Sequence, residues 1–435
     1  MPKSAHFRCI AGCATYPLDQ PIYNCETCGA LLEVCQPNPS MGRSAAQWRE
    51  ILNGRRLGQP GPQGSGVWRF HEWVLPELPQ SDIVTLGEGG TPLVQARRLG
   101  AAEGIDLTIK QCGHTLSGSF KDLGMTVLVS QVHHMRQNGR ESPGIVCAST
   151  GDTSAALAAY GAAAGLRTLV LLPKGKISAA QLVQPLAHGA KVIAIDSDFD
   201  GCMRHVQRLA QDEGIYLANS KNSLRIEGQK TVAFEIAEGF NWSVPDWVAI
   251  PGGNLGNVSA LVKGFTLLRD VGLIERLPRV VCAQAAAAAP LYHAYRDNLG
   301  PLKPVVAQNT QATAIRIGDP VSFPKAIAAL RACDGVVESV TEQELTEAAS
   351  MADETGLYLC PHTAVAMAAV RKLRRHKTIQ TGERVVVIAT AHGLKFTEFK
   401  RATASNQVPE VNLRNVHSPI EVDDNYDAVR RAALA

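Results

Sequence analysis

Short apolar runs alternating with helix-forming segments restrict the fold of this 435-residue sequence more than any other feature. Residues 145–148, 168–172 and 191–195 are strand-length, contain β-branched residues and start about 23 residues apart. Segments 153–164 and 178–188 lie between them and have the composition of helices. Strands and helices alternating at that spacing predict βαβ units and a parallel sheet with helices on both faces.

A second series of apolar runs predicts a second sheet. Residues 247–250, 279–283 and 384–390 form this series. The sequence therefore predicts an α/β protein with two three-layer α/β/α domains. In such sheets ligands bind where loops leave the carboxyl ends of the strands. We expect the functional residues on those loops.

The loop after residue 148 is rich in small polar side chains. It contains Ser149, Thr150, Gly151, Asp152, Thr153 and Ser154, and a predicted helix follows it. Hydroxyl groups and free N–H groups at a helix start suit a carboxylate or a phosphate. The alternative is simple helix capping by Asp152 or Thr153, which would need only one of these side chains.

The loop after residue 251 is rich in glycine and precedes a predicted helix at residues 258–268. It comprises Gly252, Gly253, Asn254, Leu255, Gly256 and Asn257. Glycines let the backbone approach an oxyanion closely. The loop lacks the Lys-Ser/Thr ending of a P-loop and the spacing of a dinucleotide-binding turn. It therefore predicts a site for a compact monophosphate.

Two loops near the C-terminus carry histidine. Thr390 and His392 follow the last predicted strand, and His362 opens a predicted helix. The Thr390 hydroxyl could face a ring nitrogen without protonating it. We interpret His392 as structural and His362 as a capping or packing residue.

A single lysine is placed where a cation is disfavoured. The segment Ser-Gly-Ser-Phe-Lys-Asp at residues 117–122 delivers Lys121 to the start of a helix predicted at residues 123–132. A helix N-terminus carries a partial positive charge. Lys121 is either a solvated loop residue or a lysine of lowered pKa that forms a Schiff base with an aldehyde cofactor.

Four cysteines near the N-terminus are spaced as two pairs, Cys9 with Cys13 and Cys25 with Cys28. Four thiolates could close a tetrahedral structural zinc site in a zinc-ribbon-like module. The alternative is a metal-free cluster whose cysteines merely pack. The total of eleven cysteines and the absence of an export signal argue against a disulfide framework.

The motifs divide the chain into four parts. Residues 1–40 form the Cys-rich module, and residues 41–85 form an arm with a short helix at 44–52 and a Gly- and Pro-rich loop. Trp68, Phe70 and Trp73 are expected to anchor this arm on the main body. The predicted domains are a small one at 126–214 and a large one at 86–125 with 215–435.

The polar and glycine-rich loops described above, together with the loop that carries Lys121, resemble those of pyridoxal-phosphate enzymes with the tryptophan-synthase β-like fold, called fold type II. The resemblance extends to Asn219-Ser220 and to Leu-Arg-Ile-Glu-Gly-Gln-Lys-Thr at 224–231. It also includes Ile-Arg-Ile-Gly-Asp-Pro-Val-Ser at 315–322, Pro-His-Thr-Ala-Val at 361–365 and Thr-Ala-His-Gly-Leu-Lys-Phe at 390–396. The whole set is similar to the plant-type branch of the threonine synthases.

The resemblance implies roles for individual residues. Lys121 would bind the cofactor aldehyde and move protons, and Thr390 would face the pyridine nitrogen. The loop at 252–257 would hold the cofactor phosphate. Asp152 would lie near the cofactor's phenolic oxygen, where many family members have Asn. An ionised acid there would repel a phenolate unless one of the two is protonated.

The resemblance also implies the substrate site. The turn at 149–154 would receive the substrate α-carboxylate. Arg225, with Ser119 and Asn219, would bind the phosphate of O-phospho-L-homoserine, because a guanidinium meets two phosphate oxygens at once. The implied substrate-binding residues are Ser119, Ser149, Thr150, Thr153, Asn219 and Arg225.

The implied activity is conversion of O-phospho-L-homoserine and water to threonine and phosphate by a carbon–oxygen lyase. The alternatives are a pyridoxal-phosphate-dependent serine or threonine dehydratase and a non-catalytic paralogue that binds a phosphorylated ligand. The net charge of +3 does not indicate a nucleic-acid partner, and no apolar run indicates a membrane span. We expect a homodimer in the cytoplasm.

Overall fold

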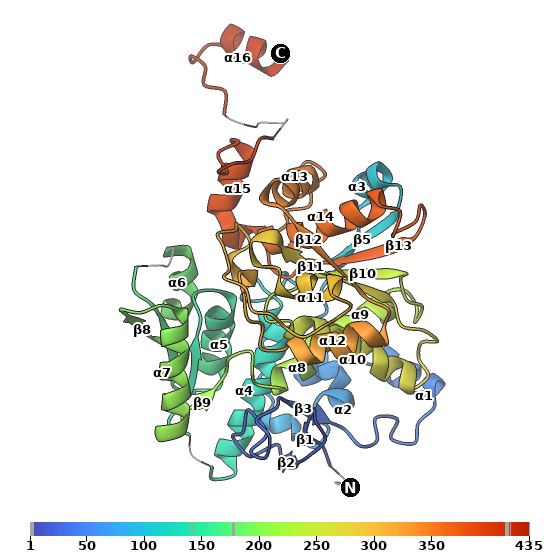
Figure 1. Cartoon of the computed structure of the whole chain (residues 1–435), viewed down its shortest axis with the longest axis vertical. Helices are drawn as coiled ribbons and strands as arrows, with labels where there is room; N and C mark the ends of the chain where they lie inside the picture. The colour runs from blue at the N-terminus through green and yellow to red at the C-terminus, as the bar shows by residue number, and fades with distance from the viewer. Residues whose placement is uncertain (1–3, 141, 176–178, 414–416, 418, 435) are drawn as a thin grey trace.

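Two separate parallel sheets organise the chain in the computed structural model, which describes residues 4–140, 142–175, 179–413, 417 and 419–434 (Figure 1). The larger sheet has six strands in the order β12-β11-β10-β13-β5-β4, and only the edge pair β4–β5 is antiparallel. Its strands are β4 (Leu93–Gln95), β5 (Asp106–Lys110), β10 (Trp247–Pro251), β11 (Arg279–Ala285), β12 (Val336–Val340) and β13 (Arg384–Ile388). The second predicted series of strands is thus confirmed.

The smaller sheet has four parallel strands in the order β8-β7-β6-β9. They are β6 (Ile145–Ala148), β7 (Thr168–Pro173), β8 (Lys191–Ile195) and β9 (Tyr216–Leu217). The first predicted series is therefore confirmed as well. Strand β9 pairs with β6 just beyond residue 214, where the sequence places the end of the small domain. The domain boundaries stay predictions.

Helices cover both faces of the two sheets, as the alternating pattern predicts. Successive residues of a strand point to opposite faces. In β6, Cys147 packs in the core shared with α4 and α5, whereas Val146 packs with Cys202 and Val206 of α7. The helices near the smaller sheet are α4 (Lys121–Gln137), α5 (Asp152–Ala163), α6 (Ala179–Ala187), α7 (Phe199–Asp212) and α8 (Leu224–Gln229). The helix predicted at 178–188 is α6; residue 178 lies outside the described residues.

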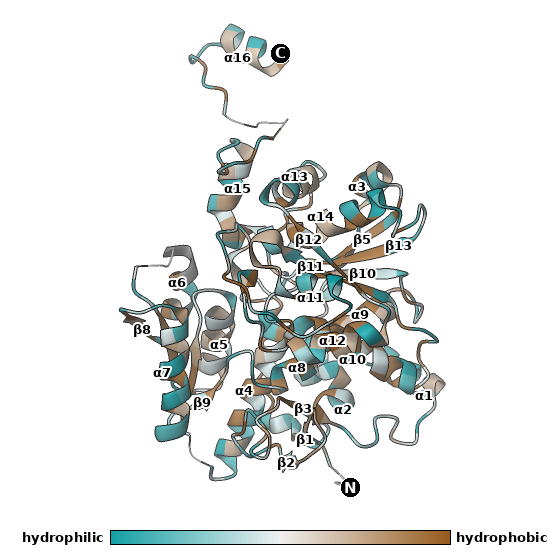
Figure 2. Cartoon of the chain, in the orientation of Figure 1, coloured by the Kyte–Doolittle hydropathy of each residue, from teal (hydrophilic) through white to brown (hydrophobic). Residues whose placement is uncertain are grey.

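The larger sheet is covered in the same way, and its strands are the brown, apolar centre of Figure 2. Val248 of β10 packs toward one core and Ala249 toward the other. Helix α14 lies against β10, β11, β12 and β13. The helices of this part are α3 (Arg97–Glu103), α9 (Thr231–Gly239), α10 (Gly256–Asp270), α11 (Pro290–Arg296), α12 (Phe323–Ala332), α13 (Glu342–Asp353), α14 (Pro361–Arg375) and α15 (Thr397–Ala404).

The N-terminal module is a small antiparallel sheet of β1 (His6–Cys9), β2 (Thr15–Pro17) and β3 (Leu32–Cys35). The arm that follows contains α1 (Ala45–Gly54), capped by Ser44, and α2 (His71–Val74). Trp68, Phe70 and Trp73 are buried, and Phe70 meets Phe234 of α9 edge to face at 5.0 Å. The expected aromatic anchor is confirmed.

The C-terminal helix α16 (Tyr426–Leu434) lies apart from the main body in Figure 1. Its described residues include no buried side chain. Among all described helices, none is both long and apolar enough to cross a membrane.

Candidate active site

The lysine loop, residues 117–122, is hydrogen-bonded to the segment that follows β13. These bonds bring Lys121 and Thr390 together at the carboxyl ends of the strands of the larger sheet. The Phe120 N–H donates to the Thr390 carbonyl at 2.9 Å, and the His392 N–H donates to the Gly118 carbonyl at 2.9 Å. Helix α4 begins at Lys121 itself. These contacts join segments about 270 residues apart in the chain.

The Lys121 side chain is half-buried, and within the described residues it forms no ion pair. The pKa of Lys121 is lowered to about 7, mainly by burial and also by the nearby Arg225 guanidinium, whereas Asp152 opposes the shift. The ammonium would sit 4.0 Å from the centroid of the Phe120 ring. A lysine that is half neutral at neutral pH is a nucleophile suited to an aldehyde. The arrangement favours a Schiff-base lysine over a solvated one.

Arg225 of α8 is a buried cation that forms no ion pair with the described residues. Its guanidinium donates to the Ala218 carbonyl at 3.1 Å and to Thr153 Oγ1 at 3.5 Å, and its Nε has no partner in the described part of the chain. Burial lowers the pKa of Arg225 to about 10. A buried charge left without a counter-ion costs several kcal/mol, roughly. This site therefore fits an anionic ligand.

The polar turn at 149–154 is not a simple helix cap. Helix α5 begins at Asp152 after Gly151, and no side chain caps it. Ser149 Oγ accepts from the Gly151 N–H at 3.2 Å, and Ser154 Oγ donates to the Gly151 carbonyl at 2.7 Å. The turn thus leaves Thr153 facing Arg225, while Asp152 pairs with Lys395 at 3.0 Å. The capping alternative is not observed.

The other predicted substrate residues are Asn219 beside the start of this turn, Thr150 within it and Ser119 in the loop that carries Lys121. Asn219 uses its amide to extend strand β6, donating to the Ala148 carbonyl at 2.9 Å and accepting from the Ala148 N–H at 3.0 Å. Ser119 Oγ accepts from the Lys121 N–H at 3.3 Å. Thr150 is half-buried. Their predicted contacts with substrate stay predictions.

The glycine turn after β10 packs closely against neighbouring segments. A Cβ at Gly252 would collide with Cys282 Sγ, and one at Gly253 would lie 3.0 Å from the Ile315 Cα. Leu255 is buried at φ +67° immediately before α10. Asn254 and Asn257 fasten the turn, since the Asn254 carbonyl accepts from the Ser322 N–H at 3.1 Å and Asn257 Nδ2 donates to the Pro251 carbonyl at 2.8 Å. The free N–H groups at the start of α10, from Gly256 on, fit a phosphate.

Thr390 lies beside a buried thiol. Its N–H donates to Thr363 Oγ1 at 3.2 Å, and its Oγ1 lies 3.9 Å from Cys360 Sγ. Burial raises the pKa of this thiol, but His362 and Thr363 outweigh burial and bring it to about 7. Cys360 caps α14 by accepting from the Thr363 N–H at 3.4 Å. No active-site role for Cys360 is predicted from the sequence.

Both histidines have structural contacts. His362 Nε2 accepts from the Ala314 N–H at 2.9 Å, and its ring meets Phe396 edge to face. His392 Nδ1 accepts from the Leu394 N–H at 3.1 Å. Burial and nearby His114 lower the pKa of His392. These contacts agree with the interpretation of both residues as structural.

The residues at this edge of the sheet fit pyridoxal phosphate. An unpaired amine of lowered pKa can bind the aldehyde, and a glycine turn opening a helix can hold the phosphate. The neutral Thr390 hydroxyl can meet a ring nitrogen without charging it. Strands β10 and β13 are neighbours, so the glycine turn and Thr390 leave the same edge.

Comparison with known proteins gives the family. The model of the pyridoxal-phosphate-dependent enzymes matches residues 84–391. "Threonine synthase 2, chloroplastic" of Arabidopsis thaliana is 49% identical over 95% of this chain and 81% of its own length. The threonine synthase of Methanocaldococcus jannaschii is 40% identical over 98% of both chains. This chain belongs to the threonine synthase family of pyridoxal-phosphate-dependent enzymes.

Solved structures agree on the fold. The threonine synthase of Escherichia coli superposes with a TM-score of 0.72, covering 99% of this chain and 95% of its own, at 21% identity. Maize serine racemase superposes with a TM-score of 0.61 over 71% of this chain and 92% of its own. The predicted tryptophan-synthase β-like fold is thereby confirmed.

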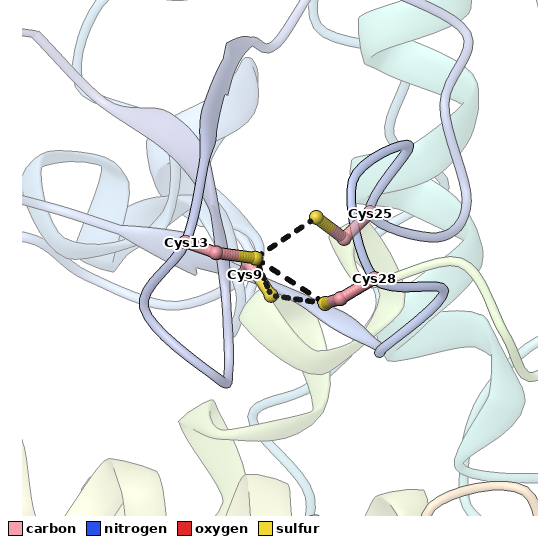
Figure 3. Close-up of side chains that lie close together, drawn as sticks. All are labelled: Cys9, Cys13, Cys25 and Cys28. Atoms are coloured by element: carbon pink, nitrogen blue, oxygen red, sulfur yellow. Dashed lines mark hydrogen bonds between the residues drawn. The ribbon is translucent and has the colours of Figure 1, made fainter.

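The four N-terminal cysteines converge on one point (Figure 3). Cys13 Sγ lies 3.4 Å from Cys9 Sγ, 3.4 Å from Cys25 Sγ and 3.2 Å from Cys28 Sγ. All four sulfur atoms lie within 4.8 Å of one another. Zinc prefers four thiolates in this arrangement, and such a closed site is structural.

We expect the purified chain to hold about one zinc ion, since four-thiolate sites bind one metal. Cys25→Ser should remove the metal and lower the midpoint of thermal unfolding, because zinc binding is coupled to folding of such modules. The matched control is Cys35→Ser, a cysteine of the same module outside the cluster. Metal analysis tests this directly. Equal thermal midpoints with and without a chelator would favour the metal-free cluster.

Lys395 is the main site residue without a predicted role. It lies in the short helical turn η6 (Gly393–Phe396) and reaches Asp152, Ser117 and Gln184. Its presence in the 390–396 motif was the only signal in the sequence. The pairing itself depends on the fold, because Lys395 and Gln184 are 211 residues apart.

Proposed function

We propose that this chain converts O-phospho-L-homoserine and water to L-threonine and phosphate. The observation that carries the proposal is the buried Arg225, whose Nε is without a partner and whose guanidinium has no carboxylate beside it in the described residues. Arg225 lies close enough to Lys121 to lower its pKa. A phosphorylated amino acid bound at Lys121 would supply the missing anion.

Lys121 carries the proton transfers in this proposal. Its pKa of about 7 lets the amine accept a proton from the substrate's α carbon and return it later at neutral pH. When bound, pyridoxal phosphate supplies an electron sink that stabilises the charge left by proton removal.

Arg225 binds the substrate phosphate and stabilises it as it leaves. Negative charge grows on the leaving phosphate as its bond to the γ carbon breaks. A preorganised guanidinium in a buried site stabilises that charge more than water does. Ser119 and Asn219 are its proposed helpers, and Thr153 already contacts it. The turn at 149–154 holds the substrate α-carboxylate, with Ser149 and Thr150 facing it.

The rival functions differ in what they ask of Arg225. A serine or threonine dehydratase would use Lys121 and the glycine turn, but its substrates carry no phosphate. Threonine deaminase of Solanum lycopersicum superposes with a TM-score of 0.59 at 20% identity, so the fold is common to both chemistries. A non-catalytic phospho-ligand binder would not need a lysine of lowered pKa.

Capture of the cofactor by the cofactor-free chain should depend on pH in a definite direction. Only the neutral amine attacks an aldehyde, and the pKa of Lys121 is about 7. The capture rate should therefore rise about tenfold per pH unit below pH 7 and level off above it. Stopped-flow absorbance measures this rate. A rate still rising tenfold per unit near pH 9 would mean that Lys121 has an ordinary pKa.

The assembly and the compartment complete the proposal. We propose a homodimer, which sedimentation velocity would test, and a cytoplasmic location. The relative from Arabidopsis thaliana is named as chloroplastic. Imaging of a tagged chain in its own cells would decide between the two compartments.

A further inference from the structure

Lys395 connects three parts of the active site. Its Nζ donates to the Ser117 carbonyl at 2.7 Å and to Gln184 Oε1 at 2.9 Å, and it pairs with Asp152 Oδ1 at 3.0 Å. Ser117 belongs to the lysine loop, Gln184 to α6 and Asp152 to the start of α5. Only 18% of the Lys395 side chain is exposed. The Lys395 ammonium is therefore held by these three protein groups rather than by solvent.

Asp152 interacts electrostatically with two lysines, Lys395 and Lys121. Its side chain is 9% exposed, and Lys395 is its ion-pair partner in the described part of the chain. Asp152 also acts on Lys121, because it raises the pKa of that amine against the effects of burial and Arg225. A single carboxylate thus lies between a paired lysine and an unpaired one.

The unpaired state of Lys121 needs an explanation. A nearby carboxylate stabilises the charged form of a buried lysine. Asp152 would therefore ordinarily raise the pKa of Lys121 and form an ion pair with it. A lysine held in that way is not nucleophilic. Asp122, which follows Lys121 in the sequence, accepts hydrogen bonds from the Ser117 N–H and the Ser117 hydroxyl. Among the described residues, Lys395 is the ion-pair partner of Asp152.

We propose that Lys395 is a positioning residue that holds Asp152 away from Lys121 and so keeps the reactive amine free. The same three contacts fix the lysine loop at Ser117 to α5 and α6. An acid can therefore occupy position 152 while the Lys121 amine stays nucleophilic. The inference rests on the proposed function only in taking Lys121 as the reactive amine.

The test measures the amine rather than turnover. Cofactor-free full-length chain is mixed with pyridoxal phosphate at several pH values, and capture at Lys121 is followed by absorbance and confirmed by borohydride reduction and mass spectrometry. In Lys395→Met, Asp152 is released to pair with Lys121. The apparent pKa of capture should rise by at least one unit, so capture at pH 7 slows about fivefold or more.

Two further variants separate this role from a merely structural one. Lys395→Arg keeps a cation at the position and should retain fast capture. Adding Asp152→Asn to Lys395→Met removes the competing carboxylate and should restore fast capture, although it restores no contact to Ser117 or Gln184. Charged groups that stay unchanged throughout are Arg225 and Asp122.

An unchanged or lowered apparent pKa in Lys395→Met would overturn the proposal. Slow capture that persists in the double variant would also overturn it, because the effect would then come from the lost loop contacts. Thermal unfolding of each variant shows whether the chain is folded, and Lys395→Arg supplies the result if Lys395→Met is not. Failure of the proposed function would appear differently, as fast capture without any turnover of phosphohomoserine.

Discussion

Replacing Lys121 by alanine is expected to abolish turnover and stable cofactor binding together. The amine is both the attachment point for the aldehyde and the group that moves protons, so kcat should fall by about 10³-fold or more. The fold should survive, because Lys121 forms no ion pair in the described structure, and truncation removes a buried cation. Visible absorbance of the purified chain and product formation measure the two losses.

The matched control for this prediction is Lys191→Ala. Lys191 lies on the edge strand β8 of the smaller sheet with an exposed side chain. This variant should retain cofactor and full turnover. If Lys121→Ala kept its cofactor absorbance, or if both variants lost activity equally, Lys121 would not be the reactive lysine.

Replacing Arg225 by methionine should have opposite effects on activity and stability. Truncating a charge that binds a substrate phosphate in a buried site costs about 2–5 kcal/mol, so kcat/KM should fall by roughly 30- to 5,000-fold. The free energy of unfolding should stay unchanged or rise, because a buried cation without a counter-ion is replaced by an apolar side chain of similar length. Steady-state kinetics and denaturant unfolding measure the two quantities.

Arg69 provides the control for Arg225. It is also buried, but it donates to both Glu238 oxygens at 2.9 and 2.8 Å. Arg69→Met leaves that acid unpaired and should lose about 3–5 kcal/mol of stability. If Arg225→Met lost as much stability as Arg69→Met, Arg225 would be a structural residue, and the case for a phosphorylated substrate would fail.

Periodicity predicted the sheets well because the strands are buried on both faces. In β6, β7 and β10 every residue is buried, so each reads as an uninterrupted apolar run. The ends of β6 and β8 lie where the sequence places them. The last predicted strand, 384–390, ends two residues earlier, at Ile388, because the chain turns there to meet the lysine loop. The two-residue strand β9 is too short to leave a periodic signal.

The candidate site was predictable where one loop carries its own chemistry. The lysine loop, the turn at 149–154 and the glycine turn each combine residue types that suit one ligand group. What the sequence could not provide are relations between loops. The pairing of Asp152 with Lys395, the missing anion at Arg225 and the approach of Cys360 to Thr390 all depend on tertiary contacts between distant segments.

The most direct test of the central claim is a product balance with O-phospho-L-homoserine. Purified chain loaded with pyridoxal phosphate is given this substrate, and phosphate, threonine and 2-oxobutyrate are all quantified over time. We predict equal amounts of phosphate and threonine and no 2-oxobutyrate. Cofactor absorbance without phosphate release, together with 2-oxobutyrate formed from added threonine, would contradict the account and identify a dehydratase.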